Sequence, residues 1–93
     1  SNAVGLIEDL AFREVPARLA HLLLKLSKSD GVADGQGVRL KAKLTHQEMA
    51  NLIGCSRETV SATMGQFRDE GFLQIDGRTI TILNEKGLSR IQG

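Results

Sequence analysis

The stretch LTHQEMANLIGCSRETV, residues 44–60, decides the fold that this sequence predicts. Thr45 and Glu48 have the T-x-x-E spacing of a capping box, in which each side chain hydrogen-bonds a backbone N–H that the helix start leaves unpaired. Gly54 can adopt the left-handed conformation that ends a helix, and Ser56 suits the N-cap of the next one. The stretch therefore predicts two short helices joined by a tight turn.

Apolar residues recur in both helices at the spacing of one buried face. They are Met49, Leu52 and Ile53 in the first helix and Val60, Met64 and Phe67 in the second. We expect the second helix over residues 57–70, with Thr63 at the edge of its buried stripe and Gly71 at its end. The two stripes indicate a shared core.

Segments on the N-terminal side predict one more core helix and a short strand. Residues 16–29 have leucines at helical spacing, and Pro16 suits a first helical turn. Residues 4–12 lack a helix cap, and we interpret them as a connector. Residues 30–37 are rich in Gly and Asp and predict a loop, after which residues 38–42 can form a strand.

On the C-terminal side, Asp76 and Gly77 separate two strand-like runs, residues 72–75 and 78–83, and are a strong signal for a two-residue hairpin turn. Asn84 can cap a last short helix. This order of elements predicts an α+β fold, a winged helix-turn-helix with a three-helix core and a β-hairpin wing.

Composition and charge limit the class of protein. The 93 residues suffice for one modest domain, and aromatic residues, at 3%, provide no stacking platform for RNA or single-stranded DNA. The net charge is +1, and residues 44–75 carry two arginines against four carboxylates, formally −2. Any DNA affinity must therefore come from a few placed groups and from pairing two copies of the domain.

Disulfide, metal and membrane chemistry are not expected. Cys55 is the only cysteine, and it forms no ligand cluster with the two scattered histidines. No run approaches the roughly 18 apolar residues of a membrane helix, and no signal peptide is visible. We expect a cytoplasmic protein. Residues 1–3 look like the remnant of a cleaved expression tag, so we expect a fragment of a longer protein.

The second helix opens with residue types that bind base edges, and in a helix-turn-helix this helix enters the major groove by its N-terminal turn. The guanidinium of Arg57 has paired N–H donors whose geometry matches the acceptors O6 and N7 of guanine. The carboxylate of Glu58 can accept a hydrogen bond from N4 of cytosine. Ser61 and Ala62 would also face outward, Ala62 offering only an apolar contact, for example to a thymine methyl. These four residues are the candidate base contacts.

Short polar side chains near helix N-termini are candidates for phosphate contacts. They are Thr45, Gln47, Ser56 and Thr59. Arg78, at the tip of the predicted wing, could reach a neighbouring phosphate. Thr45 and Ser56 cap helices in either case.

Simpler roles remain open for several residues. Glu58 is favourable in a first helical turn through the helix dipole alone, and Arg57 could be an ordinary solvated residue. Cys55 suits a small buried position in the turn. His46 could be a solvated helix residue or a neighbour of a phosphate, and His21 lies beside an apolar stripe and suits a structural role.

The same residues carry a resemblance to a known family. Residues 44–60, Phe67, residues 70–73 and the wing at 76–78 resemble the C-terminal DNA-binding domain of the catabolite activator/FNR (Crp/Fnr) bacterial transcription regulators. GCSRETV, residues 54–60, is close to the family signature, and the resemblance extends back to residue 15. It implies that Arg57 and Glu58 contact bases and that Ser56 and Thr59 contact phosphates.

The resemblance further implies a homodimer, paired through an N-terminal sensor region that is absent here. An effector such as a cyclic nucleotide would bind that region, so no cofactor is expected in this chain. Residues 4–12 would be the end of the dimerisation helix or the hinge, and residues 13–93 the DNA-binding domain. The loop at residues 30–38 would lie where some activators of the family contact RNA polymerase. The expected partner is double-stranded promoter DNA, not a membrane.

One departure from the family concerns the base contacts. Where the well-studied activators have a third, arginine contact, this chain has Ala62, and Gly65 occupies an exposed position that could hold a basic residue. The target is therefore expected to differ from the family's TGTGA-like half-site or to be recognised less stringently.

The sequence leaves one other class of function open and disfavours a second. A winged helix that serves as a protein interaction module stays open because the helix-turn-helix is nearly neutral. An enzyme is disfavoured, since Cys55, Ser56 and the histidines form no nucleophile with a nearby base and no glycine-rich phosphate loop is present.

Overall fold

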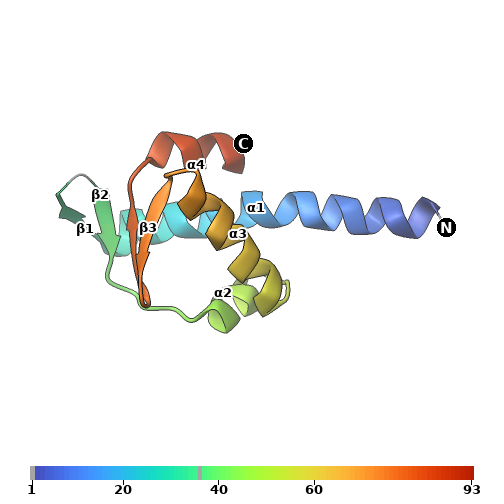
Figure 1. The fold of residues 1–93 in the computed structure, drawn as a ribbon, viewed down its shortest axis with the longest axis horizontal. Helices are drawn as coiled ribbons and strands as arrows, with labels where there is room; N and C mark the ends of the chain where they lie inside the picture. Colours follow the sequence, from blue (N-terminus) through green and yellow to red (C-terminus); the bar gives the residue numbers. More distant parts are fainter. Residues whose placement is uncertain (1, 36) are drawn as a thin grey trace.

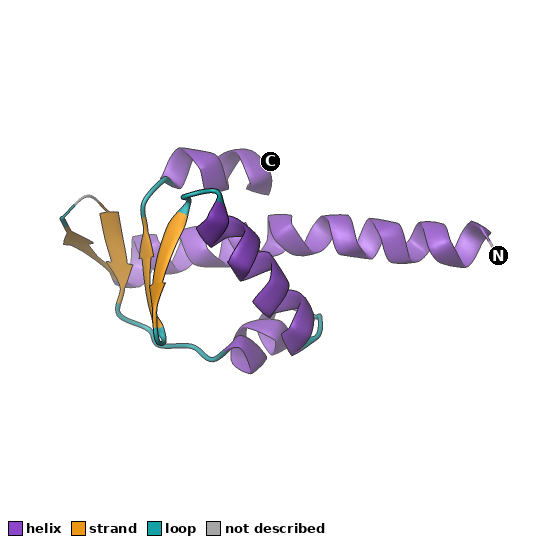
Figure 2. Cartoon of the chain, in the orientation of Figure 1, coloured by secondary structure: helices purple, strands orange, loops and turns teal. Residues whose placement is uncertain are grey.

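The computed structural model describes the backbone of residues 2–35 and 37–93, and the side chains of residues 14–35 and 37–93. Ser1, the first residue of the predicted tag remnant, lies outside the described residues. The elements are α1 (Asn2–Asp30), β1 (Gly31–Asp34), β2 (Gly37–Leu40), α2 (His46–Ile53), α3 (Arg57–Asp69), β3 (Leu73–Asp76), β4 (Thr79–Ile82) and α4 (Glu85–Gln92). The α+β winged helix-turn-helix that the sequence predicts is confirmed (Figures 1 and 2).

Helix α1 is longer than predicted. It runs without a break from Asn2 to Asp30, so residues 4–12 are helical and the connector interpretation was wrong. Pro16 lies inside the helix instead of in its first turn, where it removes one backbone hydrogen bond. Several strong helix formers, among them Leu, Ala, Glu and Arg, precede the proline and favour continuation. The N-terminal part of α1 extends beyond the other elements (Figure 1).

The four strands form one antiparallel sheet in the order β1-β2-β4-β3. Strands β3 and β4 are the predicted wing, with Leu73 opposite Ile82 and Asp76 opposite Thr79. Gly77, in the turn between them, has a φ of 62°, a conformation that favours glycine.

Strand β1 was not predicted. Its residues Gly31–Asp34 fall in the expected loop, yet they pair with β2, Gly31 lying opposite Leu40. The sequence GVAD contains two residue types that are rare in strands, so composition gives no signal for it. A Cβ added at position 31 would clash with the backbone carbonyl oxygen of Ser27, which explains the glycine.

The core lies where α1, α2, α3 and α4 meet the sheet. Its largest fully buried side chains are Leu19, Leu23, Leu40, Met49, Val60, Met64, Leu73, Ile82 and Leu88. The predicted inner stripe of α3 is confirmed, since Val60, Met64 and Phe67 are all buried. Thr63 is buried beside them, and its hydroxyl donates to the carbonyl oxygen of Thr59 at 2.8 Å.

Leu52 is the exception to the predicted core, because 63% of its surface is exposed. The buried residues of α2 are Met49 and Ala50 instead. The small side chain of Ala50 lets α2 lie close to its neighbours. Because Met49 and Ala50 face the core, Leu52 lies on the opposite, solvent-facing side of the helix.

Helix α4 is fixed at its start. As predicted, Asn84 caps it, its side-chain oxygen accepting from the backbone N–H of Gly87 at 2.9 Å. Gly87 is buried against Phe72, and an added Cβ would lie 2.7 Å from the ring. The Phe72 ring lies 6.2 Å from that of Phe67, so α4 is connected to the core of α3.

Within the part of the chain that the structure describes, no helix combines the length and apolar character needed to span a membrane. That same part contains no group of three or more His, Cys, Asp or Glu side chains placed to hold a metal ion.

Candidate nucleic-acid interface

The predicted capping box is present at the start of α2. The hydroxyl oxygen of Thr45 accepts from the backbone N–H of Glu48 at 3.0 Å, and the Glu48 carboxylate accepts from the backbone N–H of Thr45 at 2.9 Å. The hydrogen bonds from the Thr45 backbone and side chain lower the pKa of Glu48, and the charge of Arg78 acts in the same direction. The box therefore holds an ionised carboxylate at this helix start.

The turn between α2 and α3 has the predicted geometry. Gly54 has a φ of 79°, and its N–H donates to the carbonyl oxygen of Ala50 at 2.8 Å. Cys55 is half-buried and packs against the core. Ser56 caps α3 by accepting from the backbone N–H of Thr59 at 3.2 Å, and the two hydroxyl oxygens lie 2.8 Å apart.

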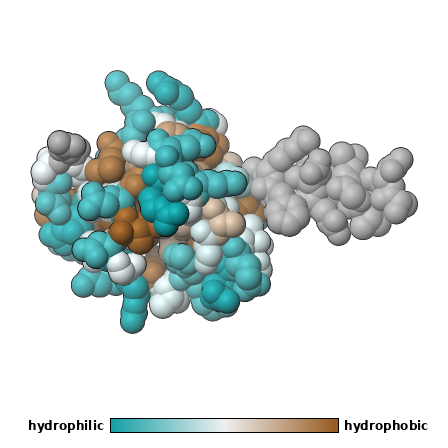
Figure 3. Space-filling model, viewed as in Figure 1, coloured by the Kyte–Doolittle hydropathy of each residue, from teal (hydrophilic) through white to brown (hydrophobic). Residues whose placement is uncertain are grey.

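The first turn of α3 presents Arg57 and Glu58 to solvent. Their side chains are 56% and 76% exposed, and Nη2 of Arg57 lies 3.4 Å from Oε1 of Glu58. An exposed pair of this kind contributes little to stability, so exchanging it for contacts with a ligand costs little. Ala62 is exposed as well. Hydrophilic side chains cover the molecule over α2 and the start of α3 (Figure 3).

Ser61 differs from its neighbours on this face. It is half-buried, and its Oγ lies 2.7 Å from Nδ1 of His46, the first residue of α2. Sequence reasoning placed Ser61 facing outward and treated His46 as solvated or near a phosphate, and it missed this contact. The two residues are 15 positions apart in the sequence, so no local sequence pattern predicts this hydrogen bond.

The wing forms the third side of the candidate interface. A cavity of about 240 Å³ lies between α2, α3 and the wing, and its polar lining consists of Thr45, His46 and Arg78. Arg78 is exposed at the hairpin turn, as predicted. Gln47 is exposed on α2 and donates to the side-chain oxygen of Asn51 at 2.9 Å. The structure thus groups Thr45 with Arg78, and Ser56 and Thr59 with the start of α3.

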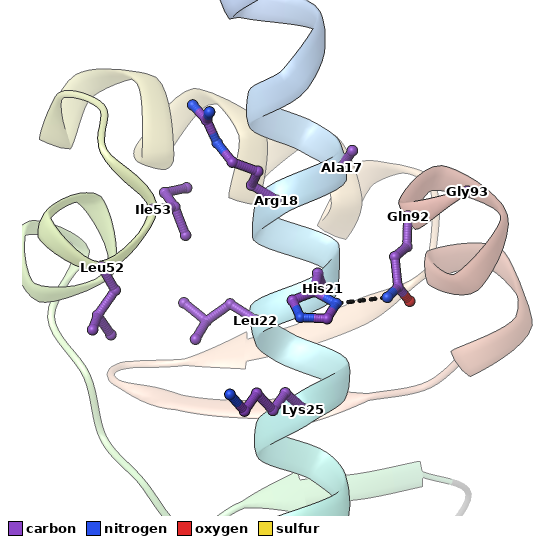
Figure 4. A pocket seen from close by; sticks show the side chains of 9 residues that line it. All are labelled: Ala17, Arg18, His21, Leu22, Lys25, Leu52, Ile53, Gln92 and Gly93. Atoms are coloured by element: carbon purple, nitrogen blue, oxygen red, sulfur yellow. Dashed lines mark hydrogen bonds between the residues drawn. The ribbon is translucent and has the colours of Figure 1, made fainter.

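A larger cavity, of about 560 Å³, lies between α1, α2 and α4 and shares no lining residue with the candidate DNA contacts (Figure 4). The exposed Leu52 lies beside it. His21 also lines it, and its Nδ1 accepts from the side-chain amide of Gln92 at 2.6 Å, which links α1 to the end of α4.

Comparison with known proteins decides the family. Residues 17–91 match the profile of the Crp-like helix-turn-helix domain. The chain belongs to this family. It is the C-terminal DNA-binding domain of a Crp/Fnr-type transcription regulator, as the resemblance implied.

Curated Crp-like relatives align along most of the chain. It is 36% identical over 84 residues to the CRP-like cAMP-activated global transcriptional regulator of Mycobacterium tuberculosis, and 38% identical over 85 residues to the global nitrogen regulator of Synechocystis. These alignments cover 90% and 91% of this chain but 38% of each relative. Both relatives are named as global regulators, the first of them as a transcriptional regulator.

Solved Crp-like structures have the same fold. The CO-dependent transcription factor CooA from Carboxydothermus hydrogenoformans superposes with a TM-score of 0.83 at 28% identity, covering 99% of this chain and 43% of CooA. A CRP/FNR-family regulator from Thermus thermophilus superposes with a TM-score of 0.76 at 34% identity, and the match covers 98% of this chain and 46% of the Thermus protein.

Proposed function

We propose that this domain binds double-stranded promoter DNA sequence-specifically, as part of an effector-responsive homodimeric bacterial regulator, with α3 in the major groove. The observation that carries the proposal is the division of α3. Its inner stripe is buried, while Arg57 and Glu58 stand exposed in the first turn, the part of a recognition helix that reaches base edges.

The base contacts follow from side-chain chemistry. The guanidinium of Arg57 donates to O6 and N7 of a guanine, and the carboxylate of Glu58 accepts from N4 of a cytosine. Ala62 contributes an apolar contact to a thymine methyl. Ser61 contributes one hydroxyl at the edge of this face.

The phosphate contacts surround the base contacts. Ser56 and Thr59 share one hydroxyl hydrogen between their oxygens, which leaves the second hydrogen to donate to a phosphate. Thr45 and Gln47 lie at the start of α2, whose dipole also favours an anion. Arg78 extends the contacts to the wing.

Affinity requires two copies of the domain, because the helix-turn-helix carries only two arginines against four carboxylates. We assign pairing to an N-terminal region outside this chain, with α1 leading into it, and place the effector site there. A cyclic nucleotide is a candidate effector, since the M. tuberculosis relative is named cAMP-activated. The β1–β2 hairpin is a candidate contact for RNA polymerase, although Gln36 in its turn lies outside the described residues. The regulator would act in the cytoplasm.

Salt dependence of duplex binding tests the proposal. Anisotropy titrations of labelled duplex and single-stranded DNA, from about 50 to 200 mM salt, should show duplex binding that weakens with salt, more steeply for the intact regulator than for this domain. If the intact regulator does not bind duplex DNA, the alternative is favoured, which is a protein interaction module. The near-neutral charge of residues 44–75 supports that alternative.

A further inference from the structure

His46 and Ser61 form a polar pair inside the candidate DNA-binding surface. Nδ1 of His46 lies 2.7 Å from Oγ of Ser61, and both residues are half-buried. Ser61 lies one helical turn beyond Arg57, so both side chains belong to one face of α3. The bond therefore joins the first residue of α2 to the face that carries the base contacts.

The direction of this hydrogen bond determines what Ser61 can offer to a ligand. When Nδ1 carries no proton, the Ser61 hydroxyl donates its hydrogen to the ring, and its oxygen presents only lone pairs outward. When Nδ1 carries a proton, the ring donates, and the hydroxyl hydrogen is free to point outward. An imidazolium allows only the second arrangement, because both ring nitrogens are then donors.

We propose that His46 is a positioning residue that sets the hydrogen-bonding polarity of Ser61 at the DNA interface, a role that rests on the proposed function. With His46 neutral and its proton on Nε2, the Ser61 hydroxyl donates to Nδ1, and its oxygen accepts from an exocyclic amino group, N6 of adenine or N4 of cytosine. Protonation places a proton from solvent on Nδ1, the hydroxyl rotates, and Ser61 donates to O6 or N7 of guanine or to O4 of thymine. One base preference therefore depends on the charge of one histidine.

Other charged groups lie around the pair. Arg78 of the wing lines the same cavity as His46, and Glu48 follows on α2 with its pKa lowered by Thr45. On α3, Arg57 and Glu58 are paired with each other at 3.4 Å. Histidine is the residue type whose charge ordinarily changes between about pH 5 and 8, which sets the two pH values of the test below.

Three variants and one matched control separate the effect of the His46–Ser61 hydrogen bond from other effects of pH. His46→Asn keeps a polar atom near the position of Nδ1 but does not titrate, and Ser61→Ala removes the hydroxyl. His46→Ala removes both the bond and the charge. His21→Asn is the control, because it removes the other histidine of the chain, which lies beside Gln92 in the separate cavity.

The experiment is selection of duplexes from a random DNA pool by the intact regulator, as wild type and with each change, at pH 6 and pH 8 and at fixed ionic strength. Wild type and His21→Asn should shift preference at one base pair by about two- to tenfold, the worth of one hydrogen bond, whereas Ser61→Ala, His46→Asn and His46→Ala should show no shift. Urea unfolding of each variant verifies that it folds, and the Ser61 variant tests the role independently of the histidine.

Two results would overturn the role. One is a wild-type preference that stays the same at both pH values although specific sites are enriched, and the other is a pH shift that survives in Ser61→Ala. Enrichment of no specific site by wild type at either pH would instead refute the proposed function itself, so the two failures are distinguishable.

Discussion

Helix α3 has 13 residues, and its inner and outer faces differ in burial and in the chemistry of their side chains. On the inner face, Val60, Met64 and Phe67 are at most 3% exposed and pack into the core. On the outer face, Arg57 and Glu58 are more than half exposed and form an ion pair with each other. Stability and the proposed DNA recognition therefore depend on separate faces of one helix, so single substitutions should change one without the other.

The largest expected effect is on the inner face. Phe67→Ala should lower the free energy of unfolding by about 3–5 kcal/mol, because it leaves a cavity beside Phe72. Urea denaturation followed by circular dichroism measures the loss. If the alanine variant does not fold, the milder Phe67→Leu provides the measurement. A loss below about 1 kcal/mol for the alanine variant would contradict a core role for this face.

The outer face should show the opposite pattern. Arg57→Ala should cost about 1–3 kcal/mol of binding free energy at the preferred site, while the free energy of unfolding changes by less than about 0.5 kcal/mol. Arg68→Ala is the matched control, since Arg68 is equally exposed on the same helix and pairs with Asp69 at 3.2 Å. Equal losses of affinity in both variants would argue against a specific role for Arg57.

A change at Gly65, which is half-buried and not exposed as predicted, should stabilise the helix without altering the buried core. A Cβ at this position would meet only Nη2 of Arg68, at an ordinary contact distance of 3.6 Å. Gly65→Ala should therefore raise the free energy of unfolding by about 0.5–1 kcal/mol, the usual difference between the two residues in a helix. A decrease in the same urea experiment would show that the backbone here needs glycine.

The smallest effect concerns the capping box of α2. Because the pKa of Glu48 is lowered in the folded domain, its ionised form adds stability that is present above the unfolded pKa, near 4.5, and is lost as the pH falls through the folded value. Glu48→Gln keeps an acceptor for the Thr45 N–H but has no charge. The stability difference between wild type and this variant should be largest above about pH 5 and should vanish at lower pH. A difference independent of pH would exclude the ionised carboxylate as its source.

Local chemistry explains what the sequence predicted correctly. The Thr45–Glu48 box, Gly54, the Ser56 cap and the Asp76–Gly77 turn each act over four residues or fewer, so their signals are complete within a short stretch. These signals fixed α2, α3 and the wing. The exposure of Arg57, Glu58 and Ala62 followed from the known start of α3, whereas their contacts with DNA stay predictions.

Packing between distant segments explains what was missed. Strand β1 exists through its pairing with β2, and Leu52 is exposed because Ala50 faces the core. The bond between His46 and Ser61 depends on how α2 and α3 pack against each other. In α1, the helix passes through Pro16, which local rules place in a first turn.

The most direct test of recognition by α3 is the sequence that the intact regulator selects from a random duplex pool, with and without Arg57→Ala, at one salt concentration. We expect wild type to enrich a two-fold-symmetric site, and the variant to lose the guanine preference at one position of each half-site while the other positions keep theirs. An unchanged enriched site in the Arg57→Ala regulator would show that Arg57 does not contact a base.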